Sequence, residues 1–368
     1  MLAMTSWLLP ADMTGAEAEA ATQLNNSSKV TDSSMTSKQN VTWDCIWFGS
    51  YPQREVIADE ASYTALNKIE YNGDADTIAD ADLFAKLQSA SDWDSNGDTI
   101  IDGDKYHRIK KSDSVAIKYA VEISKPTKFD NANYYYNWSD ETSYHYFKYE
   151  PIKWRVLSVS GSDAFLLADI ALDDQTYNHA FAEITWEKSR LRSWLNGYGS
   201  SENNKGTDYT KSNFINTAFT SSEIDAVKIT DVVNNDNLTY GTEGGNDTKD
   251  KIFSLSESEV YSTADAESYG FLKNRSTDDE GRACVSSTYA KAKGVAGSAR
   301  KPGNCNWWMR SPGYQATYAA VVMGYGEAYS QGASVYSWAT GVRPALHLDI
   351  SSDTLWSYAG TVSSNGSQ

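Results

Sequence analysis

Histidines are the first side chains to test for chemistry, and the chain has four: His107, His145, His179 and His347. They lie far apart, and no two have the short spacing typical of metal-binding histidines. We therefore expect surface or packed histidines and no metal site. The sequence also lacks a phosphate-binding glycine-rich loop, a Gly-x-Ser-x-Gly elbow and a Cys-x-x-Cys pair. Its 49 aspartates and glutamates single out no carboxylate pair, so we predict no catalytic residues and no enzyme.

One acidic cluster resembles a cation-binding loop. Asp92, Asp94, Asn96 and Asp98 place oxygen ligands at alternate positions, and a glycine stands at position six, as in the first half of a calcium loop. Position twelve, however, is Gly103 instead of the glutamate that closes such a loop. The favoured interpretation is an Asn-Gly turn that leads into the segment 105–109. Calcium stays the alternative, and no other cofactor is expected.

The three cysteines allow two arrangements. Cys284 and Cys305 can pair across a loop, which would leave Cys45 single, but spacing alone does not establish that bond. Cys45 stands between Trp43 and Trp47, where a free, buried thiol is expected.

Composition narrows the class of protein. The chain has 32 lysines and arginines against 49 aspartates and glutamates, so the formal net charge is −17 and binding of nucleic acid, which needs a basic face for the phosphates, is not expected. No apolar run is long enough to span a membrane. The chain has 24 tyrosines and 12 tryptophans beside only 7 prolines, which favours short strands and long loops over a helical bundle.

The first 40 residues differ from the rest. An apolar stretch at 2–13 precedes small residues spaced two apart, so we expect a signal-peptide remnant at 1–20, with an ordinary ragged terminus as the alternative. Residues 21–40 are polar and aperiodic and predict a disordered spacer. We expect export, to the medium or the cell surface. The folded domain is expected at 41–350, followed by a tail at 351–368.

Hydrophobic periodicity within 41–350 predicts both helices and strands, without a repeating strand-helix-strand unit. We therefore predict an α+β fold with mixed or antiparallel sheets, short helices and long loops. Strands are expected at 41–48, 144–149, 152–157, 164–170 and 251–255, and again between 307 and 348, and a turn is expected at 49–52. Helices are expected at 61–68, 79–91, 185–196 and 221–227, and after a capping box at Ser256 and Glu259; Gly197 is expected to cap the end of the third.

The segment 314–340 has the composition of a binding surface. It contains five tyrosines and Trp338, no lysine or arginine, and otherwise chiefly alanine, glycine, serine and valine. Rigid aromatics and small polar residues are typical of contact surfaces. Aromatic core strands are the alternative, but glycines interrupt the segment and many tyrosine hydroxyls would need buried partners. We therefore expect an exposed, loop-rich surface.

Several motifs in order along the chain resemble a known family. They are FGSYPQ at 48–53, EPIKWRVL at 150–157, LRSWLN at 191–196, FSLS at 253–256, WWMRSPG at 307–313 and GVRPAL at 341–346. They resemble a family of secreted or surface proteins of gut-type Gram-positive bacteria, largely of unknown function. The resemblance implies a C-type-lectin-like fold related to the formylglycine-generating-enzyme type. Some members are variable proteins of diversity-generating retroelements, which rewrite codons near the 3′ end of a gene.

That resemblance assigns roles within 314–340. The positions expected to vary and to contact a ligand are Tyr314, Thr317, Tyr318, Met323, Tyr325, Glu327, Tyr329, Ser330, Ala333, Tyr336 and Trp338. The positions expected to form a fixed scaffold are Ala319, Ala320, Val322, Gly326, Gly332 and Val335. The bracketing motifs are expected to pack beneath this surface through Trp307, Trp308, Arg310, Arg343 and Pro344.

The expected function is therefore binding of a protein or glycan target by the 314–340 surface. A fixed carbohydrate-binding or adhesion module is the first alternative, in which the same aromatics would stack on sugars. An enzyme of the formylglycine-generating type is the second, because Cys284 and Cys305 are the only pair that could serve its copper chemistry.

Overall fold

A computed structural model describes residues 23–61, 76–113 and 142–366. It confirms an α+β architecture of antiparallel and mixed sheets with short helices. The predicted signal-peptide remnant at 1–20 and most of the predicted helix at 61–68 lie outside the described residues.

Two long antiparallel strands form the centre of the larger sheet. β2 (Gln39–Ile57) and β6 (His145–Ser160) alternate buried and less buried residues, and the indoles of Trp43 and Trp154 are fully enclosed. That period-two pattern is the reason these segments form strands with one face on the core. The order is β1-β2-β6-β7-β16-β11, and β3, β5 and β17 pair beside it while β4 pairs with β5. The remaining bounds are β1 (Ser28–Thr31), β3 (Thr77–Ala79), β4 (Asp98–Ile101), β5 (Asp104–Ile109), β7 (Asp163–Ala168), β11 (Ile252–Phe253), β16 (Ala345–Asp349) and β17 (Ser357–Ser363).

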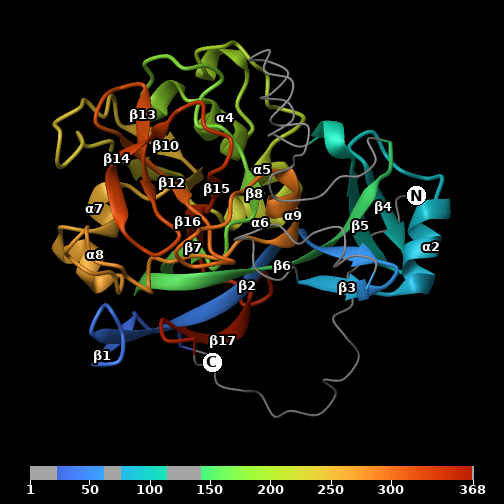
Figure 1. Cartoon of the computed structure of the whole chain (residues 1–368), viewed down its shortest axis with the longest axis horizontal. Helices are drawn as coiled ribbons and strands as arrows, with labels where there is room; N and C mark the ends of the chain where they lie inside the picture. Colours follow the sequence, from blue (N-terminus) through green and yellow to red (C-terminus); the bar gives the residue numbers. More distant parts are fainter. Residues whose placement is uncertain (1–22, 62–75, 114–141, 367–368) are drawn as a thin grey trace.

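A second sheet has five strands in the order β14-β13-β12-β15-β8. β12 pairs antiparallel with β13 but parallel with β15, so the sheet is mixed. Figure 1 shows β12, β13 and β14 on the opposite side of β7 and β16 from β1 and β17. The bounds are β8 (Asp173–Asp174), β12 (Trp307–Pro312), β13 (Tyr318–Val322), β14 (Ala328–Ser334) and β15 (Gly341–Val342); β9 (Thr230–Val232) and β10 (Thr248–Asp250) form a separate pair.

The helices are short, and several carry the caps that the sequence indicates. α7 begins with the predicted capping box of Ser256 and Glu259. The predicted helix at 185–196 is a 3₁₀ turn (Trp186–Lys188) followed by α4, which ends at a left-handed Gly197. The bounds are α2 (Ala81–Ser89), α4 (Arg190–Asn196), α5 (Phe214–Ala218), α6 (Ser221–Ala226), α7 (Glu257–Val260), α8 (Ala264–Ser268) and α9 (Thr288–Lys293), with further 3₁₀ turns at Lys111–Asp113 and Ser200–Glu202.

The predicted ends of the folded domain, at residues 41 and 350, are wrong. Within the predicted spacer 21–40, β1 pairs with residues 39–42 of β2, and Leu24 and Met35 are buried. Within the predicted tail 351–368, β17 pairs with the same strand from Trp47 to Thr42. Backbone hydrogen bonds hold these segments to the sheet, and such bonds do not depend on side-chain type. The polar, aperiodic sequence of the two segments therefore did not indicate a strand.

The predicted turn at 49–52 is also wrong. β2 continues through it, with a register shift between Trp47 and Ser50, and Ser50 then pairs with Pro151. Gly49 has a positive φ of 67°, and a Cβ there would meet Phe219 at 2.4 Å. The glycine therefore permits a β-bulge, which bends the strand without reversing it.

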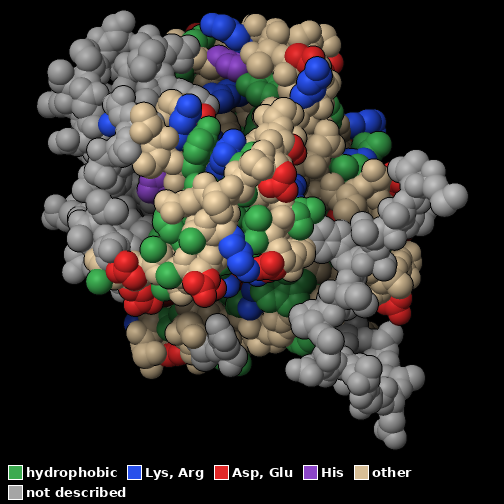
Figure 2. Space-filling view, turned by 90° about the vertical axis from the view of Figure 1, so that its right-hand side faces the viewer, with side chains coloured by type: hydrophobic (Ala, Val, Ile, Leu, Met, Phe, Trp, Pro, Cys, Tyr) green, Lys and Arg blue, Asp and Glu red, His purple; other side chains and the backbone are tan. Residues whose placement is uncertain are grey.

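One large core joins the two sheets to the helices, and a smaller cluster lies beneath α2. Figure 2 shows the face on the right-hand side of Figure 1, where basic and acidic side chains are scattered among polar ones over the described surface. Among the residues that the structure describes, no helix is both long and apolar enough to cross a membrane.

Candidate functional site

The candidate binding segment is a β-hairpin at the edge of the five-stranded sheet. β13 and β14 are antiparallel, with Tyr318 opposite Ser334 and Val321 opposite Tyr329. The connecting turn is closed by the Met323 amide, which donates to the Glu327 carbonyl at 2.8 Å. The expected loop-rich surface is therefore wrong: much of 314–340 is regular strand.

Gly332 lies inside β14 without ending the strand, and its geometry explains why. Its φ is +80°, and a Cβ there would lie 2.3 Å from the Ala319 carbonyl oxygen of the neighbouring strand. The register shifts between Ala319 and Val321, which marks an irregularity in the pairing. The glycine thus allows close strand approach at this irregularity, and β14 continues past it.

Exposure alternates along β14. Tyr329, Gln331 and Ala333 are at least partly exposed, whereas Ala328 and Ser330 are buried. Ten of the eleven residues predicted to contact a ligand are partly or fully exposed: Tyr314, Thr317, Tyr318, Met323, Tyr325, Glu327, Tyr329, Ala333, Tyr336 and Trp338. All six predicted scaffold residues are buried: Ala319, Ala320, Val322, Gly326, Gly332 and Val335. The hairpin therefore has a partly exposed outward set and a buried inward set that follow the predicted division, although Met323, Tyr329 and Ala333 of the outward set also pack against the core.

Ser330 is the exception, and its assignment as a contact residue is wrong. Its side chain is fully buried, and its hydroxyl lies 2.7 Å from the Tyr261 hydroxyl. Its carbonyl accepts a hydrogen bond from the Asn237 side chain at 2.9 Å. The alternation of β14 points this serine toward α7, where it helps to fix the hairpin.

Four aromatic side chains from three segments meet beside the hairpin, and we name Phe181, Tyr240, Tyr314 and Tyr318 the aromatic cluster. The rings of Tyr314 and Tyr318 are 4.6 Å apart, and Tyr240 and Phe181 each contact one of them at 6.3 Å and 6.0 Å. Phe181, Tyr240 and Tyr314 are 57%, 48% and 37% exposed. Sequence reasoning missed Phe181 and Tyr240, because each stands singly in a polar loop far from the hairpin.

At the turn, Tyr325 is held from two sides. The guanidinium of Arg300 lies 3.7 Å from the centre of its ring, and its hydroxyl donates to Glu327 at 3.1 Å. A cation thus borders a segment that contains none of its own. This contact orients the tyrosine while leaving it partly exposed.

The bracketing motifs lie beside the hairpin in the same sheet, and their key residues are buried. Trp307 and Trp308 are fully buried, and their indole N–H groups donate to the carbonyls of Arg282 and Gln175. Pro344 is also buried.

The two bracketing arginines differ in their partners. Arg310 binds both carboxylate oxygens of Glu259, at 2.6 and 2.9 Å. Burial raises the pKa of Glu259, but this guanidinium outweighs it and the net shift is downward. Arg343 is fully buried and donates to the carbonyls of Ala168, Arg282 and Asp169.

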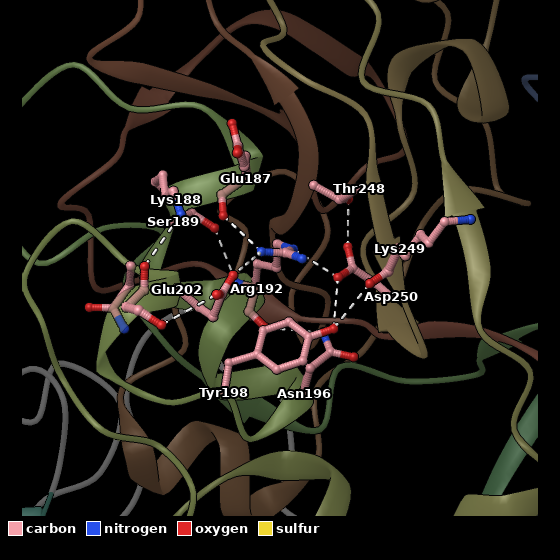
Figure 3. Close-up of polar contacts among 12 residues, drawn as sticks. Glu187, Lys188, Ser189, Arg192, Asn196, Tyr198, Glu202, Thr248, Lys249 and Asp250 are labelled. Atoms are coloured by element: carbon pink, nitrogen blue, oxygen red, sulfur yellow. Dashed lines mark hydrogen bonds and ion pairs between the residues drawn. The ribbon is translucent and has the colours of Figure 1, made fainter.

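A second buried ion pair, between Arg192 and Asp250, joins α4 to β10 (Figure 3). Asp250 is fully buried and accepts hydrogen bonds from Arg192 Nε at 2.7 Å and Trp186 Nε1 at 3.0 Å. Thr248 and Tyr198 donate to the same carboxylate at 2.7 and 3.0 Å. Four donors on one carboxylate make this cluster a rigid joint between α4 and β10.

Cys284 and Cys305 are brought together, while Cys45 lies apart on β2. All three are free and buried, which confirms the interpretation of Cys45. The Cys305 amide donates to the Cys284 carbonyl at 2.8 Å. Burial opposes ionisation of Cys284, but the thiol of Cys305 and the guanidinium of Arg343 lower its pKa below the usual value.

The acidic loop at 92–104 uses its carboxylates internally. Asp94 accepts from the amides of Asn96 and Asp98 at 2.8 and 2.9 Å, and Asp98 binds Lys105 and His107. β4 and β5 follow as a hairpin. Among the described residues no cluster of three or more His, Cys, Asp or Glu side chains could hold a metal ion.

The other histidines also have partners. His145 lies 2.5 Å from Glu55, His347 lies 3.0 Å from Asp163, and His179 lies 3.3 Å from the Tyr209 hydroxyl. Burial, with Arg190 and Lys205 nearby, lowers the pKa of His179 to about 4.

Asp174 on β8 is a buried carboxyl that sequence reasoning missed. It is fully buried, and neither of its oxygens has a hydrogen-bond partner within the described parts of the chain. Burial and the adjacent Asp173 raise the pKa of Asp174 well above its usual value. A folded protein that holds this proton loses stability as the pH rises above the unfolded pKa of about 3.9.

Asp174→Asn is therefore expected to raise the free energy of unfolding at pH 7 by about 1–3 kcal/mol, because the amide removes the cost of ionising or neutralising the buried group. The gain should shrink as the pH falls toward 4, where the unfolded aspartate also takes up a proton. Urea denaturation of both proteins at pH 7 and 4.5 measures the difference. A less stable variant at pH 7 would mean that Asp174 is ionised and stabilised.

Comparison with known proteins gives one match. No curated protein and no solved structure matches the chain. Residues 161–350 match the model of a family described as a domain of unknown function, DUF6273. The match runs from the start of β7 to the end of β16 and includes the hairpin, both bracketing motifs and the Arg192–Asp250 pair. It covers just over half of the chain, which therefore belongs to the DUF6273 family.

Proposed function

We propose that this chain is a secreted or surface-exposed ligand-binding protein with a C-type-lectin-like fold, whose β13–β14 hairpin and flanking residues within 314–340 bind a protein or glycan target. We further propose that it is a variable protein of a diversity-generating retroelement. The observation that carries this proposal is the division of the hairpin into an outward set of expected contact residues and a buried scaffold.

The physical argument concerns what such a division permits. The exposed parts of the contact residues can change without opening the core, because the hairpin is held by β12 beside it, where Trp307 and Trp308 are fully buried. Tyrosines give large, rigid contact area at low conformational cost, and small residues between them adapt their hydrogen bonds. Arg300 at the turn adds a charged group to one end of this surface.

A fixed carbohydrate-binding or adhesion module is the second candidate, favoured by the aromatic cluster. Phe181 and Tyr240 lie outside 314–340 yet contact Tyr318 and Tyr314. A platform shared between the hairpin and two other loops suits stacking on sugar rings. We propose no formylglycine-generating activity, because the sulfur-bearing side chains of Cys284 and Cys305 are enclosed in the core, where a peptide substrate has no access.

The binding proposal predicts separate effects on affinity and folding. Alanine substitution of Tyr325, Tyr329 or Tyr336 should leave the fold intact and weaken target binding by about 1–3 kcal/mol each. Protein and glycan arrays identify the target, and titration calorimetry with thermal unfolding measures both quantities. Tyr144→Ala, an exposed tyrosine on the α2 side of the molecule, is the matched control and should change neither. Unfolding of the three hairpin variants would contradict the surface assignment.

A further inference from the structure

A concave site lies far from the hairpin, between the two ends of the described chain. It has a volume of about 900 Å³ and is walled by residues before β1, by the loop after β16 and by the start of β17. The lining residues are Gln23, Leu24, Asn25, Asn26, Val159, Gly161, Ile350, Ser351, Asp353, Trp356, Ser357 and Tyr358. We name this site the terminal groove. In Figure 1, β1 and β17 lie along the lower edge of the larger sheet, and β13 and β14 lie above β7 and β16, on the far side of the molecule.

We propose that the terminal groove is a second binding site, which takes a neutral oligosaccharide. Twelve residues line it, and Asp353 is the only one with a charged side chain. Without a basic group in the lining, the groove has nothing to neutralise a phosphate, sulfate or carboxylate. A neutral, hydroxyl-rich ligand fits this chemistry, and the volume lies near the upper end of sites for small organic ligands, roughly 300–1,000 Å³.

The polar side chains of the groove keep hydrogen-bonding capacity for a ligand. Asn26 accepts the Val159 amide through Oδ1 at 2.7 Å, which fixes the side chain and leaves its NH₂ group as a donor. Asn25 donates to Asp44 at 3.0 Å, which leaves its Oδ1 as an acceptor. Carboxamides that offer a donor and an acceptor, next to the Asp353 carboxylate, match the paired hydroxyls of a sugar ring.

Two aromatic side chains supply the apolar part. Tyr358 is 42% exposed at the start of β17, and Trp356 is partly buried and packs against the core. The Trp356 indole N–H is buried, with no hydrogen-bond partner anywhere in the described residues. A sugar ring stacked on Tyr358 would bury its apolar C–H groups against the phenol ring.

The terminal groove does not depend on the proposed function of the hairpin. β17 and residues 23–26 lie outside the 161–350 family match, so membership in that family assigns nothing to them. A protein held on a glycan through the terminal groove would present its hairpin on the opposite side. Both sites could then be occupied at once.

The test uses the full-length chain and a panel of neutral cello-, manno-, xylo- and chito-oligosaccharides, with oligogalacturonate as the acidic comparator. Tryptophan fluorescence and titration calorimetry measure association. We expect binding of at least one neutral probe, and at least tenfold weaker association for Tyr358→Ala and Asp353→Ala. Tyr358→Phe keeps the ring and should retain binding, while unchanged melting temperatures show that the variants fold.

The hairpin variant Tyr329→Ala separates the two proposals. Its association with the oligosaccharide should equal that of the unaltered protein, because Tyr329 lies on β14. Loss of sugar binding in Tyr329→Ala with none in Tyr358→Ala would overturn the groove and favour the hairpin as the carbohydrate site. Absence of binding to every neutral probe, or equal binding of oligogalacturonate, would also overturn it.

Discussion

Replacement of Trp308 by alanine is expected to lower the free energy of unfolding by about 3–5 kcal/mol. The indole is fully buried, its ring centre lies 5.6 Å from that of Tyr177, and its N–H donates to the Gln175 carbonyl at 2.9 Å. The variant would leave a large cavity and a buried carbonyl without its donor. Guanidinium denaturation followed by circular dichroism measures the loss.

Tyr329→Ala is the matched control for this prediction. Trp308 pairs with Val321 on β13, and Val321 pairs with Tyr329 on β14, so the three residues form one row across the sheet. Only the tyrosine, on the edge strand, is partly exposed. Its removal should cost no more than about 1 kcal/mol, and equal losses for the two variants would mean that the edge strand is part of the core.

Asp250→Ala is expected to destabilise the protein by about 3–5 kcal/mol, the usual cost of removing one partner of a buried ion pair. The Arg192 guanidinium would lose the carboxylate at 2.7 Å while its side chain stays largely buried. Trp186, Thr248 and Tyr198 would each lose an acceptor as well. Thermal and chemical unfolding measure the effect, and Asp250→Asn should be milder because it keeps an acceptor oxygen.

The control for this ion pair lies on the same two-stranded sheet, formed by β9 and β10. Asp231 and Lys249 are bonded on the surface, with side chains 80% and 70% exposed. Exposed pairs contribute little, so Asp231→Ala should change stability by less than about 1 kcal/mol. A small loss in Asp250→Ala would contradict the role of the buried cluster as a rigid joint.

Local signals predicted much of the secondary structure. The capping box at Ser256, the left-handed Gly197 and the alternation around Trp154 depend on residues close in sequence, and the structure has each of them. Propensity and capping act over a few residues, so one sequence is enough to find them.

Features that depend on distant partners escaped prediction. β1 and β17 form because their backbones hydrogen-bond to β2. Their own residues are polar and are exposed or only partly buried, so the segments lack the apolar pattern of a strand. The bulge at Gly49 depends on how β2 pairs with β6. Such long-range pairings leave no period in the segment that makes them.

The sequence was enough to predict which residues of the candidate site are partly exposed, but not its strand conformation or its contacts with distant segments. Composition identified 314–340, yet glycines suggested loops where the pairing of β13 and β14 tolerates them. Ser330 looked like a surface serine because its partner Tyr261 lies far away in the sequence. Phe181 and Tyr240 join the aromatic cluster only through the fold.

The most direct test of the central claim is deep sequencing of the 3′ end of this gene across the cells of one population. The account predicts substitutions at codons of the outward hairpin residues, such as Tyr325, Tyr329 and Tyr336. It predicts none at the buried Ala320, Val322 and Ser330 between them. A uniform sequence, or substitutions spread equally over buried and exposed codons, would contradict a diversified binding surface.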